Sequence, residues 1–283
     1  MKTSRPPLIS NVKFRLLPAL SLLWKHYIYQ LCFAIYYYWW FKIWETRIPP
    51  WLYARIYVSW RRVRREAGVL RGVFERFNAR RLVEFGCGIG RHGYLLSRLG
   101  FDVLLTDVVD WRFGVARRLP FASYDVLKGG RLGEFEGAYA MGLLIVMDLD
   151  GVVRALPNMA SNVKRDGVLV FDYNFTTYNE PREVSVRARG RTYKALMRWE
   201  DVKPIEGGVY YRYRVEVVDE GGRVVGVEDT GYPVYTKESL FKAIERAGLE
   251  LVEVIWARWN PERYVYELAR READSAFIVL RNP

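Results

Sequence analysis

The sequence of 283 residues is long enough for one large domain with an extension, and its composition, 51% hydrophobic and 27% charged, excludes an intrinsically disordered protein. Two His and two Cys residues show no metal-ligand spacing, so we expect no metal site. The excess positive charge behind the net charge of +12 lies before residue 82: residues 1–81 carry sixteen basic and three acidic residues, whereas the remainder carries 28 basic and 29 acidic residues. The near-neutral remainder disfavours a catalytic domain that is itself a broad nucleic-acid-binding surface.

Residues 1–50 are predicted to form a basic extension rich in aromatic residues. The aromatic run continues past it, with fifteen aromatic residues from Trp24 to Trp60. Trp and Tyr favour the headgroup boundary of a membrane over its hydrocarbon centre, and Gln30 and Lys42 interrupt the apolar run, so a membrane span is the least favoured interpretation. Helices over residues 16–60 would instead contact a membrane surface, a partner such as a second copy of the chain, or the core of the protein itself.

The stretch "RIYVSWRRVRREAGVLRGVFERF", residues 55–77, follows this extension. Its apolar residues recur at helical spacing, which predicts one basic amphipathic helix. The simplest interpretation of its Arg cluster is a solvated face.

From residue 82 onward, strand-like and helix-like segments alternate, which predicts an α/β domain over residues 51–283 with a parallel sheet covered by helices on both faces. The predicted strands, in chain order, are "RLVEF", "DVLLTD", "FASYDV", one within "GAYAMGLLIVM", "GVLVFDYN", "LELVEVIW" and "SAFIVL". The predicted helices are "HGYLLSRLG", "DGVVRALPNMASNV" and "TKESLFKAIERAG". Between about residues 176 and 234, alternating polar and apolar residues with Gly-containing turns predict a small inserted antiparallel sheet.

The glycines after the first strand can be interpreted in two registers. From Gly88 the sequence is G-x-G-x-x-G, a dinucleotide-binding fingerprint. From Gly86 it is an acid, Glu84, followed by G-x-G-x-G through Gly90. In either register an acid at the end of the second strand, Asp107, suits the hydroxyls of a ribose.

The second register resembles the first motif of class I S-adenosylmethionine-dependent methyltransferases. The run "GCGIGRHGYLLSRLGFDVLLTD" is similar to the small-molecule branch of that family, and the inserted sheet resembles the substrate cover of glycine, sarcosine and sugar-amine N-methyltransferases. The segment "KESLFKAIERAGLELVEVIWA" with "DSAFIVL" resembles the end of the family's sheet, a helix, a strand and a reversed seventh strand. The resemblance implies a Rossmann-like seven-stranded methyltransferase sheet that binds S-adenosylmethionine.

The resemblance also implies a role for particular residues. Glu84 and the glycines Gly86, Gly88 and Gly90 would line the cofactor site, and Asp107 would accept hydrogen bonds from both ribose hydroxyls. In "FASYDV", Asp125 matches the acid that caps the adenine amino group, with Val126 beside it. We expect neither Cys87 nor His92 to be catalytic: the first is a small packing residue, and the second marks the start of a helix.

Substrate-side candidates are fewer, and no catalytic residue is assigned. Tyr173 and Asn174 leave the carboxyl end of a strand, where open α/β sheets place their ligands. Tyr53 and Tyr57, from the helical segment before the glycine loop, are candidate lid residues. The segment after the fourth strand, "MGLLIVM", lacks the Asn/Asp-Pro-Pro-aromatic motif of enzymes that methylate exocyclic base nitrogens.

The leading hypothesis is a methyltransferase that acts on N or O of a small-molecule or lipid-like acceptor. Alternatives are an RNA methyltransferase that uses the "RRVRR" arginines for phosphate contacts, and a protein that binds S-adenosylmethionine without catalysis and docks a partner through its N-terminal helices. If the glycines bind a dinucleotide in the register that begins at Gly88, a nicotinamide-dependent oxidoreductase is a further alternative. We expect a cytoplasmic protein, associated with a membrane or a second copy if residues 16–60 bind either one. Abundant Arg and a single Gln are typical of a heat-adapted source.

Overall fold

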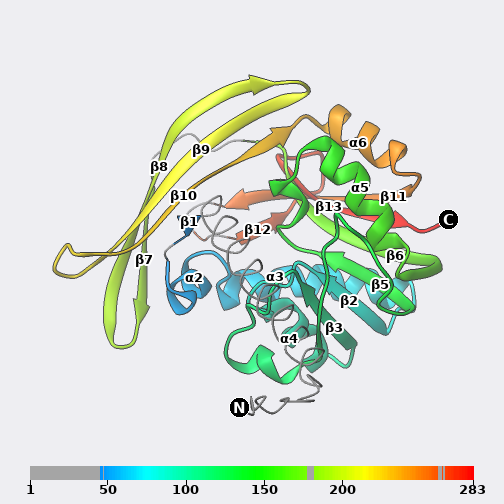
Figure 1. Ribbon diagram of the computed structural model, residues 1–283, viewed down its shortest axis with the longest axis horizontal. Coiled ribbons are helices and arrows are strands. Elements are labelled where there is room, and N and C mark those ends of the chain that lie inside the picture. The colour runs from blue at the N-terminus through cyan, green and yellow to red at the C-terminus, as the bar shows by residue number, and fades with distance from the viewer. Residues whose placement is uncertain (1–44, 47, 177–181, 261–262, 264) are drawn as a thin grey trace, which may run out of the picture. The chain divides into compact units, whose positions relative to one another are not determined.

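The computed structural model describes residues 45–46, 48–176, 182–260, 263 and 265–283 (Figure 1). The chain divides into two compact units, residues 1–45 and residues 46–283, and the helices and long strands of the described residues belong to the second. Of the predicted helical region over residues 16–60, residues 16–44 and 47 lie outside the described residues. Its described part contains the two-residue strand β1 (Glu45–Thr46) and, after it, the helix α2 (Pro50–Ile56). No helix in the described part of the chain is both long and apolar enough to cross a bilayer.

An eight-stranded sheet forms the centre of the second unit, with strand order β12-β11-β13-β6-β5-β2-β3-β4. Its strands are β2 (Arg81–Phe85), β3 (Asp102–Asp107), β4 (Phe121–Ser123), β5 (Phe135–Ala140), β6 (Val163–Asn174), β11 (Glu250–Asn260), β12 (Val265–Leu268) and β13 (Ser275–Arg281). The first five strands pair in parallel, whereas β13 is antiparallel to both β6 and β11. The predicted reversed last strand is therefore present.

The strand β12 adds an eighth strand to the seven that the sequence predicted. Pairing of β11 with β13 extends from Glu250 to Ala257, and β11 pairs with β12 from Ala257 to Asn260. Because β11 would otherwise be an open edge, β12 satisfies backbone groups at its far end. Four residues are too few for a periodicity signal, which explains why the sequence did not predict this strand.

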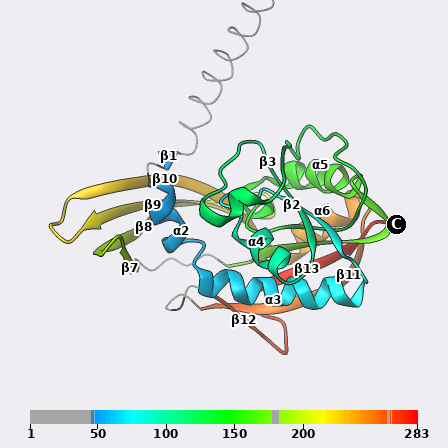
Figure 2. The same cartoon turned by 90° about the horizontal axis from the view of Figure 1, so that it is seen from below.

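Two apolar cores cover the opposite faces of this sheet. Helices α5 (Leu149–Ala160) and α6 (Lys237–Arg246) pack on the face that contains Val83, whereas α3 (Trp60–Arg76) and α4 (Arg91–Arg98) pack on the face that contains Leu82. Figure 2 shows α3 and α5 on opposite sides of the sheet. Neighbouring residues of a strand enter different cores because side chains alternate across a sheet. Short 3₁₀ helices, η1 (Gly114–Arg118) and η2 (Leu144–Val146), lie in two of the connections.

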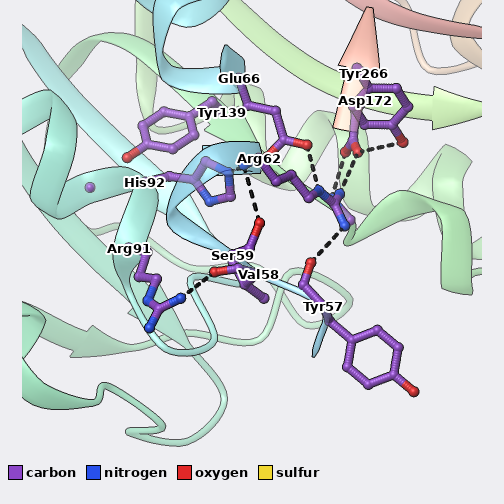
Figure 3. Close-up of polar contacts among 12 residues, drawn as sticks. Tyr57, Val58, Ser59, Arg62, Glu66, Arg91, His92, Tyr139, Asp172 and Tyr266 are labelled. Atoms are coloured by element: carbon purple, nitrogen blue, oxygen red, sulfur yellow. Dashed lines mark hydrogen bonds and ion pairs between the residues drawn. The ribbon is translucent and has the colours of Figure 1, made fainter. Parts of the chain in front are cut away.

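The single helix that the sequence predicted over residues 55–77 is two helices, α2 (Pro50–Ile56) and α3. The break occurs at Ser59, which has extended φ and ψ angles of −60° and 149° and accepts a 3.3 Å hydrogen bond from the backbone N–H of Arg62. This N-cap starts α3 afresh. The side chain of Arg91 donates to the carbonyl of Val58 and that of Arg62 to the carbonyl of Tyr57 at 3.0 Å, so the carbonyls near the break are satisfied (Figure 3).

The inserted segment forms a separate antiparallel sheet between β6 and α6, as the sequence predicted. Its long strands are β7 (Arg182–Ala188), β8 (Arg191–Ile205), β9 (Gly208–Asp219) and β10 (Val224–Tyr235), each paired with the next along the chain. The sheet is curved, and α2 lies on its concave side (Figure 1). Leu52 and Ile56 of α2 enter the same apolar core as Val215 and Val217 of β9. The insertion is therefore fixed to the helix that precedes α3.

Candidate functional site

The glycine loop joins the carboxyl end of β2 to the start of α4. Gly86, Gly88 and Gly90 have φ angles of 66°, 51° and 75°, in the left-handed region that favours glycine. A Cβ atom on Gly86 or Gly90 would lie 2.8 Å from Leu143 or Ala116, respectively, whereas at Gly88 it would meet no atom within 4 Å. The loop is thus closed at both ends by packing and open at its middle glycine.

Asp107 lies at the end of β3, directly beside the open glycine. Its Oδ2 accepts a 2.9 Å hydrogen bond from the N–H of Gly88, and its Oδ1 accepts one of 2.8 Å from the N–H of Val108. Burial raises the pKa of Asp107, while the hydrogen bonds from Gly88 and Val108 oppose that rise. The structure therefore brings together Gly88 and Asp107, as expected for two cofactor-binding residues.

Glu84, also predicted to line the cofactor site, lies beneath the loop. Its Oε2 accepts hydrogen bonds of 3.0 Å from the N–H of Gly93 in α4 and from the hydroxyl of Tyr139 in β5. Burial raises its pKa to about 7, against the opposing effects of His92, Tyr139 and Gly93. These contacts tie α4 to two strands, so Glu84 supports the loop from inside, and its contact with a cofactor stays a prediction.

Asp125 and Val126 follow β4 and are not part of it, because the strand ends at Ser123, earlier than the sequence predicted. Asp125 accepts a 3.0 Å hydrogen bond from the N–H of Leu127, and its carboxylate lies 3.3 Å from Nζ of Lys128. Val126 is buried. Both residues follow the carboxyl end of β4, the edge strand that pairs in parallel with β3, so they lie at the same carboxyl-terminal edge of the sheet as Asp107.

The substrate-side candidates of β6 are built into the sheet. The Tyr173 hydroxyl is buried and accepts a 3.2 Å hydrogen bond from the N–H of Tyr235, the last residue of β10. Asn174 is also buried, and its Oδ1 accepts a 3.3 Å hydrogen bond from the hydroxyl of Ser275. These contacts connect β6 with the inserted sheet and with β13.

The lid candidates of α2 lie between the glycine loop and the inserted sheet. The rings of Tyr53 and Tyr57 are 4.8 Å apart. Burial raises the pKa of Tyr53 strongly, and the negative charges of Glu228 in β10 and of Asp107 raise it further. The charges of Asp107, in the central sheet, and of Glu228, in the inserted sheet, therefore both act on Tyr53.

A buried ionic network behind the loop was not predicted from the sequence (Figure 3). Arg62 and His92 each approach Glu66 to 2.6 Å, Arg62 lies 3.7 Å from Asp172, and Tyr266 donates a 3.3 Å hydrogen bond to Asp172. The interpretation of the arginines in α3 as a solvated face is wrong for Arg62. A signal was present, because Glu66 is an acid on the otherwise apolar stripe of that helix.

Cys87, inside the glycine loop, is buried, and its thiol lies 3.7 Å from the carbonyl oxygen of Gly88. Burial raises the pKa of this thiol far above its ordinary value, with further increases from the charges of Glu84 and Asp107. The thiol therefore stays protonated, which removes the nucleophilic thiolate form.

The fold is that of the class I S-adenosylmethionine-dependent methyltransferases. Six strands run in one direction, β2 to β6 and β11, and the reversed strand β13 lies between β6 and β11. No protein-family model and no curated protein sequence matches the chain. The chain is similar to the solved structure of an S-adenosylmethionine-dependent methyltransferase from Clostridium acetobutylicum, at 12% identity and a TM-score of 0.60, over 81% of this chain and 96% of that one.

Two further solved structures are similar over most of the chain. The sugar N-methyltransferase KedS8 from Streptoalloteichus has 21% identity and a TM-score of 0.58, over 76% of this chain and 86% of that one. The amino pentose methyltransferase CalS10 from Micromonospora echinaspora has 18% identity and a TM-score of 0.60, over 78% and 92%. These likenesses confirm the predicted fold.

Proposed function

We propose that this protein is an S-adenosylmethionine-dependent methyltransferase that acts on N or O of a small-molecule acceptor. The observation that carries the proposal is the position of Asp107 against the open Gly88, at the carboxyl ends of β3 and β2. Open α/β sheets bind nucleotide-like ligands at this edge. The solved structures of similar fold support it, since they are of methyltransferases, one of them with bound S-adenosylmethionine.

The residues at this edge fit the proposed cofactor. Asp107 would accept hydrogen bonds from the ribose hydroxyls, and the backbone N–H groups of Gly88 and Val108 would hold its carboxylate in place. The lack of a side chain at Gly88 lets the cofactor approach the backbone. Asp125 and Val126 are the candidates on the adenine side. S-adenosylmethionine supplies an activated methyl group, so the protein chiefly has to align the acceptor and exclude water.

The reversed strand β13 argues against the dinucleotide register of the glycines. A dinucleotide-binding sheet has six parallel strands, whereas here β13 pairs antiparallel with β6 and with β11. Of the "RRVRR" arginines that the RNA hypothesis uses, Arg62 is not available for phosphate contacts, because it donates a hydrogen bond to the buried Glu66, whereas Arg61, Arg64 and Arg65 are exposed.

Calorimetric titration with S-adenosylhomocysteine tests the proposal. We expect binding of S-adenosylhomocysteine and no binding of NADH. Asp107→Ala should weaken the affinity roughly 10- to 150-fold, since hydrogen bonds to a charged group contribute about 1.5–3 kcal/mol. Asp102→Ala is the matched control, because Asp102 begins the same strand, is exposed and lies 3.9 Å from Arg81. Binding of NADH alone, or equal affinity in the Asp107→Ala variant, would contradict the proposal.

A further inference from the structure

Glu228, on the inner face of the inserted sheet, is a buried carboxyl group with incomplete hydrogen bonding. It is 6% exposed. Its Oε1 accepts only a long hydrogen bond of 3.5 Å from the Tyr213 hydroxyl, and its Oε2 has no hydrogen-bond partner within the described part of the chain. Burial raises its pKa, and the nearby hydroxyls of Tyr57 and Tyr213 only partly offset that rise. Because buried carboxylates in proteins are normally paired, a cation is the partner that this group lacks.

Aromatic side chains surround this carboxyl on the same face of the sheet. Tyr213 and Tyr232 have ring centroids 5.7 Å apart, and Trp199 lies 5.3 Å from Tyr213. Tyr211 lies 4.8 Å from Trp199 and 4.5 Å from Tyr232. The negative faces of aromatic rings attract organic cations, and a carboxylate beside them attracts the same cation through its opposite charge. The cluster therefore has the chemistry of an ammonium-binding site.

Helix α2 and its tyrosines connect this cluster with the proposed cofactor site. The hydroxyl of Tyr57, the residue that caps α2, lowers the pKa of Glu228, and the charges of Glu228 and Asp107 both raise the pKa of the neighbouring Tyr53. Figure 1 shows α2 between the concave face of the inserted sheet and the glycine-loop end of the central sheet. A small molecule held by Glu228 would thus be within the same region as Asp107.

We infer that the methyl acceptor is a small organic amine, bound as its ammonium ion by Glu228 and the tyrosines around it. This inference rests on the proposed function, and it assigns transfer to N instead of O. Before the reaction, the ammonium gives one proton to the Glu228 carboxylate and so frees its lone pair. The new N–C bond then forms as the S–C bond of the sulfonium breaks, which leaves a neutral thioether and a methylated ammonium. Glu228 returns its proton to solvent when the product departs.

Binding of cyclohexylamine, an ammonium ion at neutral pH, tests the inference by saturation-transfer NMR and calorimetry on the full chain. Cyclohexanol is the uncharged probe of the same size. We expect the amine to bind at least tenfold more tightly than the alcohol, and Glu228→Gln to abolish that difference. Asp229→Asn is the matched control, because Asp229 is the next residue of β10 and pairs with Arg212 on the opposite face. This control should retain the preference for the amine.

The remaining readouts separate the possible failures. Glu228→Gln should unfold at a higher temperature than the wild type, because it removes a buried carboxyl group that lacks a partner. Equal binding of amine and alcohol by the wild type would overturn the inference without any variant, as would a preference that survives in Glu228→Gln. If the wild type still binds S-adenosylhomocysteine in those cases, only the amine inference fails. If the wild type does not bind S-adenosylhomocysteine, the proposed function itself is contradicted.

Discussion

Glu66 shows how a single buried carboxylate is kept ionised inside this protein. Burial alone would raise its pKa, but the charge of Arg62 and the hydrogen bonds from His92 and Arg62 outweigh burial and lower the pKa to about 2. For His92, burial would lower the pKa, and the hydrogen bond and charge of Glu66 raise it above 6.5 instead. The Glu66 contribution to stability is thus present above pH 4.5 and lost as the pH falls towards 2, whereas that of His92 is present below pH 6.5 and lost as the pH rises through its raised pKa.

Glu66→Gln should therefore destabilise the protein most near pH 6, where both partners are charged. We expect the free energy of unfolding to fall by about 3–5 kcal/mol, because removal of one partner leaves buried cations uncompensated. The loss should be smaller at alkaline pH, where His92 is neutral. Urea denaturation at both pH values measures these changes. Glu75→Gln, in the same helix, removes an exposed pair with Arg71 and should cost about 0–1 kcal/mol. Equal losses of unfolding free energy in the two variants would show that the buried pair contributes no more to stability than the exposed pair.

At the scale of elements, Gly93 determines how closely α4 packs on the central sheet. A Cβ atom there would lie 2.2 Å from Leu105 of β3 and 2.8 Å from the Glu84 carboxylate. Gly93→Ala should lower the free energy of unfolding by about 1–3 kcal/mol through overpacking, although Ala is the better helix former. Gly72→Ala is the control: Gly72 lies in α3 with open space around it, and the substitution should stabilise the protein by up to about 1 kcal/mol. Urea denaturation gives both values, and stabilisation by Gly93→Ala would disprove the close packing.

Elements were predictable from the sequence where a local pattern decides them. The succession of strands along the chain and the inserted sheet follow from hydrophobic periodicity and turns. The reversed last strand was expected from the resemblance to the methyltransferase family, and the Gly88–Asp107 pair follows from a short spacing between consecutive elements. The break at Ser59 was missed because the apolar stripe continues on either side of it. The Arg62–Asp172 contact joins residues 110 positions apart, and no helical pattern indicates such a partner. The Glu228 cluster is likewise created by strand pairing across the insertion.

At the scale of the whole molecule, the uneven distribution of charge along the chain favours binding of its N-terminal part to an anionic membrane surface. Residues 1–81 carry sixteen basic and three acidic residues, whereas the remainder is close to neutral. Each Lys or Arg near an anionic membrane contributes about 1 kcal/mol of attraction, and aromatic residues add affinity for the headgroup region. The basic, aromatic N-terminal segment therefore has the composition of a peripheral membrane anchor.

We accordingly expect the full chain to sediment with vesicles that contain phosphatidylserine and not with vesicles of phosphatidylcholine alone. Binding should fall in about 1 M salt, where the Debye length shrinks to about 3 Å. Removal of residues 1–44, which contain six basic and no acidic residues, should release the protein, while binding of S-adenosylhomocysteine by the truncated chain checks that the methyltransferase fold persists. Undiminished vesicle binding after truncation would assign the contact to the exposed arginines of α3 instead. Failure of the full chain to bind, with a change of oligomeric state on truncation, would make the segment a contact between copies of the chain.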